Sequence, residues 1–382
     1  MADLLHFPPP PPLAAADLRQ EVRDFLRETI GDRQARDRAL SWTGHDKAFS
    51  RKLGERGWIA MTWPKKYGGH ERSALERYVV MEEMLAAGAP VAAHWIADRQ
   101  SGPLILKDGS EAQRQAILPR IAAGECFFCI GMSEPDSGSD LAAVRTRAVE
   151  VEGGFRINGT KLWTSGAHYS HYMILLCRTD GGVEARHAGM SQFLVDLTTP
   201  GITIRPIVDM TGAHHFNEVS FEDVFLPADA IIGKRGDGWN QVMSELAFER
   251  SGPERFLSSF ELLDQLVRVL SRSPDGQAAG AIGRIVARVM TLRRMSQSVA
   301  GMLQRGENPM LQASIVKDLG ASFEQQIPEI ARQLVDVEPD EGSAKDFAAV
   351  MAITLLNAPA WSLRGGTREI LRGIIARGLG LR

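Results

Sequence analysis

The spacing of apolar residues changes twice along the chain, and this change constrains the fold more than any other feature. From Leu13 to about Glu125 the apolar residues recur with a helical period, and from about Cys126 to Ile232 they alternate with a period of two. From Gly238 to the end the helical period returns. Helices, then strands, then helices favour an antiparallel β-domain between two helical domains. A doubly wound dinucleotide-binding fold is disfavoured, because no GxGxxG sequence follows a predicted strand.

We therefore predict an α+β multidomain protein. Its segments are a proline-rich tail over 1–12, an N-terminal α domain over 13–125, a central β domain over 126–232 and a C-terminal α bundle over 233–382. The tail contains the run Pro8–Pro12, which cannot form a helix and is expected to be extended. The 382 residues suffice for two or three domains of roughly 100–200 residues each.

Individual elements follow from the same periodicity. The stretch 145–156 alternates around Gly153-Gly154, which predicts a β-hairpin. Further strands are predicted over 172–177, 192–197, 202–208 and 218–225, and long helices over 239–250, 258–271, 278–305 and 311–334. Many short strands at close spacing are typical of a small barrel or sandwich.

Composition excludes several classes of function. The formal net charge of −3 gives no electrostatic reason to expect a nucleic-acid partner. We find no apolar run long enough to span a bilayer and no signal peptide, so we expect a cytoplasmic protein without a membrane partner. Cys126 and Cys129 have CxxC spacing, but two aromatic residues lie between them and no second pair of ligands follows. We expect two buried thiols there, and no metal site.

Two segments of the central region predict a site for a planar cofactor. The turn over 132–140 is rich in hydroxyls and small residues, and a strand-like stretch places Trp163 beside Thr164, Ser165 and a glycine. The indole would cover one face of a flavin ring while Ser133 and the two hydroxyls that follow the indole reach polar atoms at its edge. Taken alone, each segment is more often a polar loop or a core tryptophan, and the two together, in this order, are far more specific.

With these motifs the chain resembles the acyl-CoA dehydrogenase family of flavoenzymes, over nearly its whole length after the proline tail. The matching segments, in their order, are Trp63-Pro-Lys-Lys-Tyr-Gly-Gly69, Leu118-Pro-Arg-Ile-Ala-Ala-Gly-Glu125, Ser133-Glu-Pro-Asp-Ser-Gly-Ser-Asp140, Asn158-Gly-Thr-Lys-Leu-Trp163, Asn217-Glu-Val-Ser-Phe-Glu-Asp-Val224 and Gly366-Thr-Arg-Glu-Ile370. The resemblance implies FAD as cofactor, an acyl-CoA as substrate and an α–β–α order of domains.

The resemblance also implies which positions form the site. The implied cofactor-binding residues are Ile130, Met132, Ser133, Gly138, Ser139, Trp163, Thr164, Ser165, Thr367 and Glu369, and those implied near the substrate are Ser139, Arg250 and Gly366. Asp136 stands where the family more often has glycine. Its carboxylate would repel a pyrophosphate unless it faces solvent.

The reaction that the family catalyses needs one carboxylate as base, opposite the flavin. At one of the two places where family members carry it, immediately before a Gly-Thr pair, this chain has Gly365. The other place, on the helix after the β-domain and immediately before an arginine, holds Glu249. Pro253 cannot donate to the Glu249 carbonyl, so we expect the helix to kink there. An exposed helical glutamate is the alternative interpretation, and Glu245 and Glu254 stay open as bases.

The C-terminal region departs from the family pattern. Members carry an Arg-x-x-Phe-Gly element and a Gly-Gly-x-Gly stretch for a neighbouring subunit's FAD, whereas here the corresponding stretches over 270–277 and 335–342 lack them. The second stretch is acidic, which suits a pyrophosphate poorly. Some members that act on bulky acyl-CoAs are heterotetramers of unlike chains, and we predict that this chain bears the base in such a pair. The alternative is a homo-oligomer that uses Arg268 or Arg272.

The predicted activity is FAD-dependent α,β-desaturation of an acyl-CoA to a trans-2-enoyl-CoA, with electrons passing to an electron-transfer flavoprotein. Two other functions on this fold stay open. One is a flavin oxidase or monooxygenase that reacts with oxygen. The other is a non-catalytic subunit that stabilises a catalytic partner in a homo- or heterotetramer.

Overall fold

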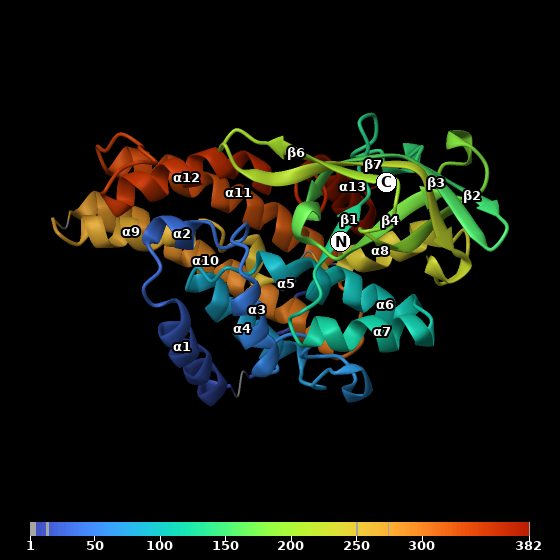
Figure 1. The fold of residues 1–382 in the computed structure, drawn as a ribbon. Helices are drawn as coiled ribbons and strands as arrows, with labels where there is room; N and C mark the ends of the chain where they lie inside the picture. The colour runs from blue at the N-terminus through green and yellow to red at the C-terminus, as the bar shows by residue number, and fades with distance from the viewer. Residues whose placement is uncertain (1–4, 13–14, 250, 274, 382) are drawn as a thin grey trace. The chain divides into compact units, whose positions relative to one another are not determined.

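The computed structural model describes residues 5–12, 15–249, 251–273 and 275–381, and the side chains of residues 245–249 lie outside the description. The chain divides into two compact units (Figure 1). We call Met1–Gly44, Arg72–Val91 and Ala247–Arg382 the helical unit, and His45–Glu71 with Ala92–Leu246 the sheet unit. Some of the N-terminal helices therefore belong to the helical unit and the others to the sheet unit.

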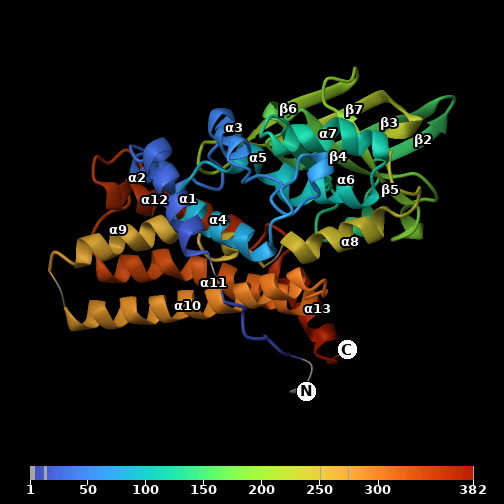
Figure 2. The same ribbon diagram turned by 90° about the horizontal axis from the view of Figure 1, so that it is seen from below.

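The helical unit is built from α1 (Ala16–Ile30), α2 (Ala35–Ala39), α4 (Ala74–Ala86), α9 (Phe260–Leu270), α10 (Gly276–Gln304), α11 (Met310–Leu334), α12 (Asp346–Trp361) and α13 (Arg368–Gly378). The long helices α10 and α11 lie side by side (Figure 2). Ser73 begins α4 with a capping box, because its hydroxyl accepts from the Glu76 amide while the Glu76 carboxylate accepts from the Ser73 amide. The helices predicted over 258–271, 278–305 and 311–334 are confirmed.

Buried charges join three helices of this unit. Glu82 and Glu83 of α4 are each only 7% exposed, although two adjacent carboxylates would normally face solvent. Arg293 of α10 binds Glu82 through two nitrogens, at 2.6 and 2.9 Å, and Arg19 of α1 bridges both carboxylates. Arg23 adds a second contact to Glu83 at 2.7 Å. The glutamate pair is therefore a structural feature of the helical unit.

The described part of the proline-rich tail packs on the helical unit. Phe7 packs against the cluster around Val299, and the His6 carbonyl accepts a hydrogen bond from Gln312 at 3.0 Å. Pro11 lies so close to Gly301 that a Cβ there would come within 2.8 Å of the proline ring. Residues 5–12 contain no helix, as the proline run predicts, and no strand.

The sheet unit contains α3 (Lys47–Glu55), α5 (Ala92–Ile96), α6 (Gly102–Asp108), α7 (Glu111–Ala122) and the start of α8 (Gly238–Glu249), together with β1 (Phe128–Gly131), β2 (Arg147–Val151), β3 (Gly154–Ser165), β4 (Tyr172–Arg178), β5 (Met190–Asp196), β6 (Ile202–Val208), β7 (His214–Pro227) and β8 (Ile231–Ile232). The strands form one sheet in the order β6-β7-β3-β2-β4-β5-β8, with β1 pairing parallel to β4. Most pairs are antiparallel, as predicted, and the β2–β3 hairpin turns at Gly153, whose φ is +79°.

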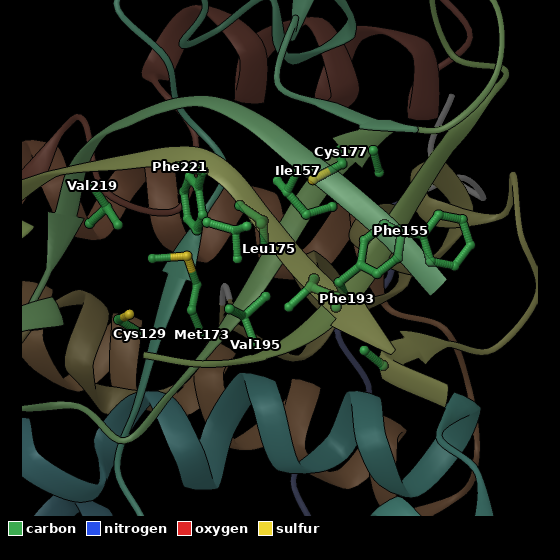
Figure 3. Packing of buried hydrophobic residues seen from close by; sticks show 14 of the residues in the cluster. Cys129, Phe155, Ile157, Met173, Leu175, Cys177, Phe193, Val195, Val219 and Phe221 are labelled. Atoms are coloured by element: carbon green, nitrogen blue, oxygen red, sulfur yellow. The ribbon is translucent and has the colours of Figure 1, made fainter. Parts of the chain in front are cut away.

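One hydrophobic cluster forms the core of this unit. Side chains from β3, β4, β5 and β7 point toward one another (Figure 3), among them Ile157, Leu175, Phe193, Val219 and Phe221, each no more than 2% exposed. Along β7 buried residues alternate with more exposed ones, as on a half-buried sheet, whereas β4 is buried on both of its faces. In the part of the chain that the structure describes, no helix is long and apolar enough to cross a membrane.

Candidate functional site

A break in the register of β3 determines how the predicted cofactor residues lie. Lys161 pairs with Val219 of β7 and Thr164 pairs with Asn217, so one extra residue is accommodated on β3 between them. Trp163 lies in this bulge with φ +58°. A bulky residue with positive φ is an outlier that costs of order 1–3 kcal/mol and is commonly found at binding sites.

The bulge turns the tryptophan outward and the following threonine inward. The Trp163 side chain is 55% exposed, and its ring meets Phe216 edge to face at a centroid distance of 5.8 Å. Thr164 is 1% exposed, and its hydroxyl has no hydrogen-bond partner among the described residues. Ser165 is half-buried and pairs with Phe216. An exposed aromatic face thus lies beside a buried hydroxyl without a partner.

A buried ion pair connects this strand to the loop that carries the other predicted residues. Lys161 is fully buried, and its ammonium donates to the Glu134 carboxylate at 2.8 Å and to the Met132 carbonyl at 3.0 Å. The Glu134 carboxylate also accepts from the Arg145 amide at 2.7 Å and the Thr146 amide at 2.9 Å. Burial would raise the pKa of Glu134, but the Lys161 charge and these hydrogen bonds outweigh it, so the pKa lies below its ordinary value.

The first part of the predicted cofactor loop is held against β3. The Ser133 carbonyl accepts from the Leu162 amide at 2.9 Å, which joins the loop to the residue before Trp163. Met132 packs against the cluster around Val144, and Ile130 lies half-buried at the end of β1. The structure therefore brings the two predicted segments together within the sheet unit.

The second part of the loop is open. Gly138 and Ser139 are exposed, and a Cβ added at Gly138 would meet nothing within 4 Å. The Asp136 side chain is 82% exposed and 4.0 Å from Arg145. The carboxylate thus faces solvent, which is the orientation that removes the predicted conflict with a pyrophosphate.

These features fit the flavin half of FAD. Trp163 offers an apolar plate, Thr164 a hydroxyl that has no hydrogen-bond partner among the described residues, and Gly138 an open backbone for a large anionic group. Among the described residues, no group of three or more histidine, cysteine, aspartate or glutamate side chains could hold a metal ion.

The predicted base lies where α8 ends. Glu249 is the last residue of α8, its side chain lies outside the described part of the chain, and Arg250 is outside the described residues altogether. The kink predicted at Glu249 is instead a helix end. Gly252 is extended and Pro253 begins a new 3₁₀ turn, because a proline there cannot donate the amide hydrogen that would continue α8. The Glu245 side chain is likewise outside the description, and Glu254 is 2% exposed in the helical unit.

The C-terminal residues of the predicted site lie in the helical unit. Gly365 and Gly366 have φ of +66° and +97°, and the Gly366 carbonyl accepts from the buried ammonium of Lys317 at 2.5 Å. Thr367 is the N-cap position of α13. The pKa of the exposed Glu369 carboxyl is lowered by its own backbone amide and by the Thr367 hydroxyl. Gly365 and Gly366 thus precede α13, Thr367 caps it, and Glu369 lies in its first turn.

Most described residues of the two stretches that depart from the family pattern are exposed. In the acidic stretch between α11 and α12, Asp336, Glu338, Asp340 and Glu341 are all exposed. Arg268 forms a surface ion pair with Asp264 at 2.7 Å, and Arg272 is exposed after α9.

Sequence reasoning missed the residues that hold the bulge. The buried Lys161–Glu134 pair was not identified, although a lysine at an inward-facing strand position, after Ile157 and Gly159, was a usable signal. The contacts of Asn217 with His168 and His214 were also missed, since nothing in the spacing of these residues indicates them.

The cysteines do not take part in the site. Cys126, Cys129 and Cys177 are free and buried, as expected for the first two. Burial raises the pKa of Cys126 to about 11 and that of Cys177 to about 12. Such thiols are not nucleophilic near neutral pH.

Known family models match most of the chain. Three models match: the acyl-CoA dehydrogenase N-terminal domain over residues 14–125, the middle domain over 129–224 and the C-terminal domain over 236–380.

Individual relatives agree with the family models. The chain is 32% identical to the acyl-CoA dehydrogenase IpdE1 of Mycobacterium tuberculosis, over 96% of this chain and 97% of that protein. Its fold is similar to the Tcur3481-Tcur3483 steroid ACAD, with a TM-score of 0.86, 26% identity and coverage of 99% and 98% of the two chains. It is also similar to the ChsE4-ChsE5 complex from Mycobacterium tuberculosis, with a TM-score of 0.82, 28% identity and coverage of 96% and 97%.

Proposed function

Because this chain belongs to the acyl-CoA dehydrogenase family, we propose that it desaturates the bond between the α and β carbons of a CoA thioester, with Glu249 as the base. FAD, when bound, supplies the acceptor for the β-hydride. The observation that carries the proposal is the exposed Trp163 ring on a positive-φ bulge that is joined to the 132–140 loop. That arrangement provides a rigid apolar plate with hydroxyl groups beside it.

The residues of this chain would act as follows. Trp163 and the loop from Ile130 to Ser139 would bind and orient the flavin, and Thr164 or Ser165 would donate a hydrogen bond at its polar edge. The carboxylate of Glu249 would take the α-proton of the thioester. Burial of that carboxylate by flavin and acyl chain would raise its pKa from an ordinary value of about 4.3 toward neutrality.

The alternative base position holds Gly365, and this favours Glu249 as the base. Gly365 has no side chain, and its φ of +66° suits glycine and strains other residues. A carboxylate at that position is therefore missing. Glu249 stands immediately before an arginine on the helix that follows the β-domain, whereas Glu254, which also precedes an arginine, lies in the 3₁₀ turn after that helix and is 2% exposed.

We further propose a paired assembly for this chain. The acidic, exposed stretch over 335–342 would repel the pyrophosphate of a neighbour's FAD. The related ChsE4-ChsE5 structure is a complex of two named chains, and the Tcur3481-Tcur3483 enzyme is described as a steroid ACAD. We therefore propose a second acyl-CoA dehydrogenase-like chain as partner, a bulky acyl-CoA of the steroid side-chain type as substrate, and an electron-transfer flavoprotein as electron acceptor.

The test is a spectral titration of the purified chain, alone and together with its partner chain. Bleaching of flavin absorbance by a steroid side-chain CoA, and weaker bleaching by straight-chain acyl-CoAs, is the expected result. Stoichiometric FAD on the lone chain would overturn the paired assembly. Rapid oxygen consumption without any response to CoA thioesters would favour a flavin oxidase instead.

A further inference from the structure

The side-chain amide of Asn217 is held in one orientation. Asn217 lies in β7 and is fully buried. Its Nδ2 donates to the Thr164 carbonyl, directly after Trp163, at 2.9 Å. A carbonyl can only accept, so the amide nitrogen must face Thr164 and the amide oxygen must face away from it.

That amide oxygen accepts hydrogen bonds from two imidazoles. His214 Nε2 lies 2.7 Å from Asn217 Oδ1 and His168 Nδ1 lies 3.2 Å from it. The two rings stack with a centroid distance of 3.9 Å and an interplanar angle of 26°. Since Oδ1 is an acceptor, both ring nitrogens must carry a hydrogen, which fixes the neutral tautomer of each imidazole.

The histidines come from the two segments that flank the bulge. His168 lies in the 3₁₀ turn Ala167–Tyr169, which follows the bulge directly, and His214 is the first residue of β7. A backbone hydrogen bond from the Gly166 amide to the His215 carbonyl, 2.9 Å long, lies between them. Because the φ of Trp163 is unfavourable, the bulge needs contacts outside β3 to keep this conformation.

We propose that His168 and His214 are positioning residues, which act through Asn217 to hold the Thr164 carbonyl and thereby the bulge that presents Trp163. The importance of that bulge for FAD rests on the proposed function. The hydrogen-bonded group of His168, His214 and Asn217, which we call the clamp, does not depend on that function. The histidines do not form a metal site, because each directs a ring N–H to the same oxygen and the described residues contain no group that could hold a metal.

Isosteric substitutions separate this role from a role in bulk packing. The amide nitrogen of asparagine occupies the place of an imidazole Nδ1, and that of glutamine the place of an Nε2. His168→Asn and His214→Gln therefore keep the donor to Asn217, whereas His168→Gln and His214→Asn misplace it. Both histidines are exposed residues, so the protein should fold with any of the four amides.

The first readout needs no cofactor. Hydrogen exchange is followed by mass spectrometry in peptides that cover residues 160–170 of the flavin-free protein. Loss of a hydrogen bond of ordinary strength accelerates exchange by about tenfold. We expect this acceleration for His168→Gln and His214→Asn, and wild-type exchange for His168→Asn and His214→Gln. The second readout is FAD affinity, which we expect to fall about tenfold in the same two variants and to be kept in the other two.

The outcomes are distinguishable from those that test the proposed function. If asparagine and glutamine at each position give equal exchange, the clamp is overturned, whether or not FAD binds. The crossed pattern is faster exchange in His168→Gln and His214→Asn with wild-type exchange in the other two variants. If it appears but the wild-type assembly binds no FAD, the clamp stands and the proposed function fails. If both readouts show the crossed pattern, the histidines are positioning residues for the cofactor site.

Discussion

The ammonium of Lys161 lies 2.8 Å from the carboxylate of Glu134, and both groups are buried in the sheet unit. This contact joins the strand that carries Trp163 to the loop that carries Ser133 and Gly138. The first part of the loop, from Met132 to Glu134, is therefore held against β3 before any ligand binds, and preorganisation of this kind lowers the cost of binding.

Removal of one partner of this pair should be costly. Lys161→Met leaves the Glu134 carboxylate buried without its ammonium, and we expect the free energy of unfolding to fall by about 3–5 kcal/mol. The double variant Lys161→Met/Glu134→Gln should recover most of this loss, because no unpaired charge stays buried. Urea unfolding measures the free energy of unfolding of the single and the double variant. Lys65→Met is the control, because the exposed Lys65–Glu71 pair contributes about 1 kcal/mol or less. Equal losses in the single and double variants would contradict the account.

The Glu134 carboxyl predicts a pH dependence of stability. Its pKa is lower in the folded protein than the ordinary 4.5, so its contribution is complete above the unfolded-state pKa and is lost as the pH falls through the folded-state pKa. The difference in unfolding free energy between wild type and Glu134→Gln should therefore be largest near neutral pH and shrink below about pH 4.5. A difference that grows on acidification would show that Glu134 is not stabilised as the anion.

Thr164→Val tests whether the inward-facing hydroxyl serves a ligand. A buried hydroxyl without a partner costs about 1–3 kcal/mol, so valine should leave the flavin-free protein as stable or more stable. FAD affinity should fall by about tenfold, the equivalent of one hydrogen bond. Ser298→Ala, in the helical unit, is the control, since the Ser298 hydroxyl is also buried without a partner among the described residues. If both variants bind FAD like the wild type, Thr164 does not contact the cofactor through its hydroxyl.

Gly138→Ala tests the open part of the loop. A Cβ there meets nothing within 4 Å, so we expect unfolding free energy to change by about 0.5 kcal/mol or less. If a large anionic part of FAD approaches this backbone, the added methyl group should weaken FAD binding by about tenfold or more. Gly283→Ala, equally unobstructed but in the helical unit, should leave FAD binding unchanged. Unaltered FAD affinity in Gly138→Ala would remove Gly138 from the site.

The order of elements could be predicted because it depends on periodicity alone. The alternation over 145–156 and the helical spacing over 278–305 each reflect one buried face. The bounds of β2 and α10 are close to those predicted, whereas β3 continues to Ser165, beyond the predicted end at 156. The division of the N-terminal helices between two units could not be predicted, because it depends on contacts between residues far apart in sequence.

The outward turn of Trp163 could not be predicted from the sequence. A strict period of two places Ile157, Lys161 and Trp163 on the same inward face of β3. The bulge reverses this for Trp163 and places Thr164 inward, since β3 holds one residue more than β7 between two pairing positions. The decisive feature is therefore the pairing with another strand, which the residues of β3 alone do not encode.

The central proposal, that Glu249 takes the α-proton, is tested most directly by anaerobic titration of Glu249→Gln with an acyl-CoA that bleaches the wild-type flavin. Glu245→Gln, four residues earlier on the same helix, is titrated in parallel. We predict that Glu249→Gln keeps its FAD and is reduced at least about 100-fold more slowly than the wild type. Reduction of Glu249→Gln at the wild-type rate, or loss of reduction in Glu245→Gln instead, would contradict the proposal.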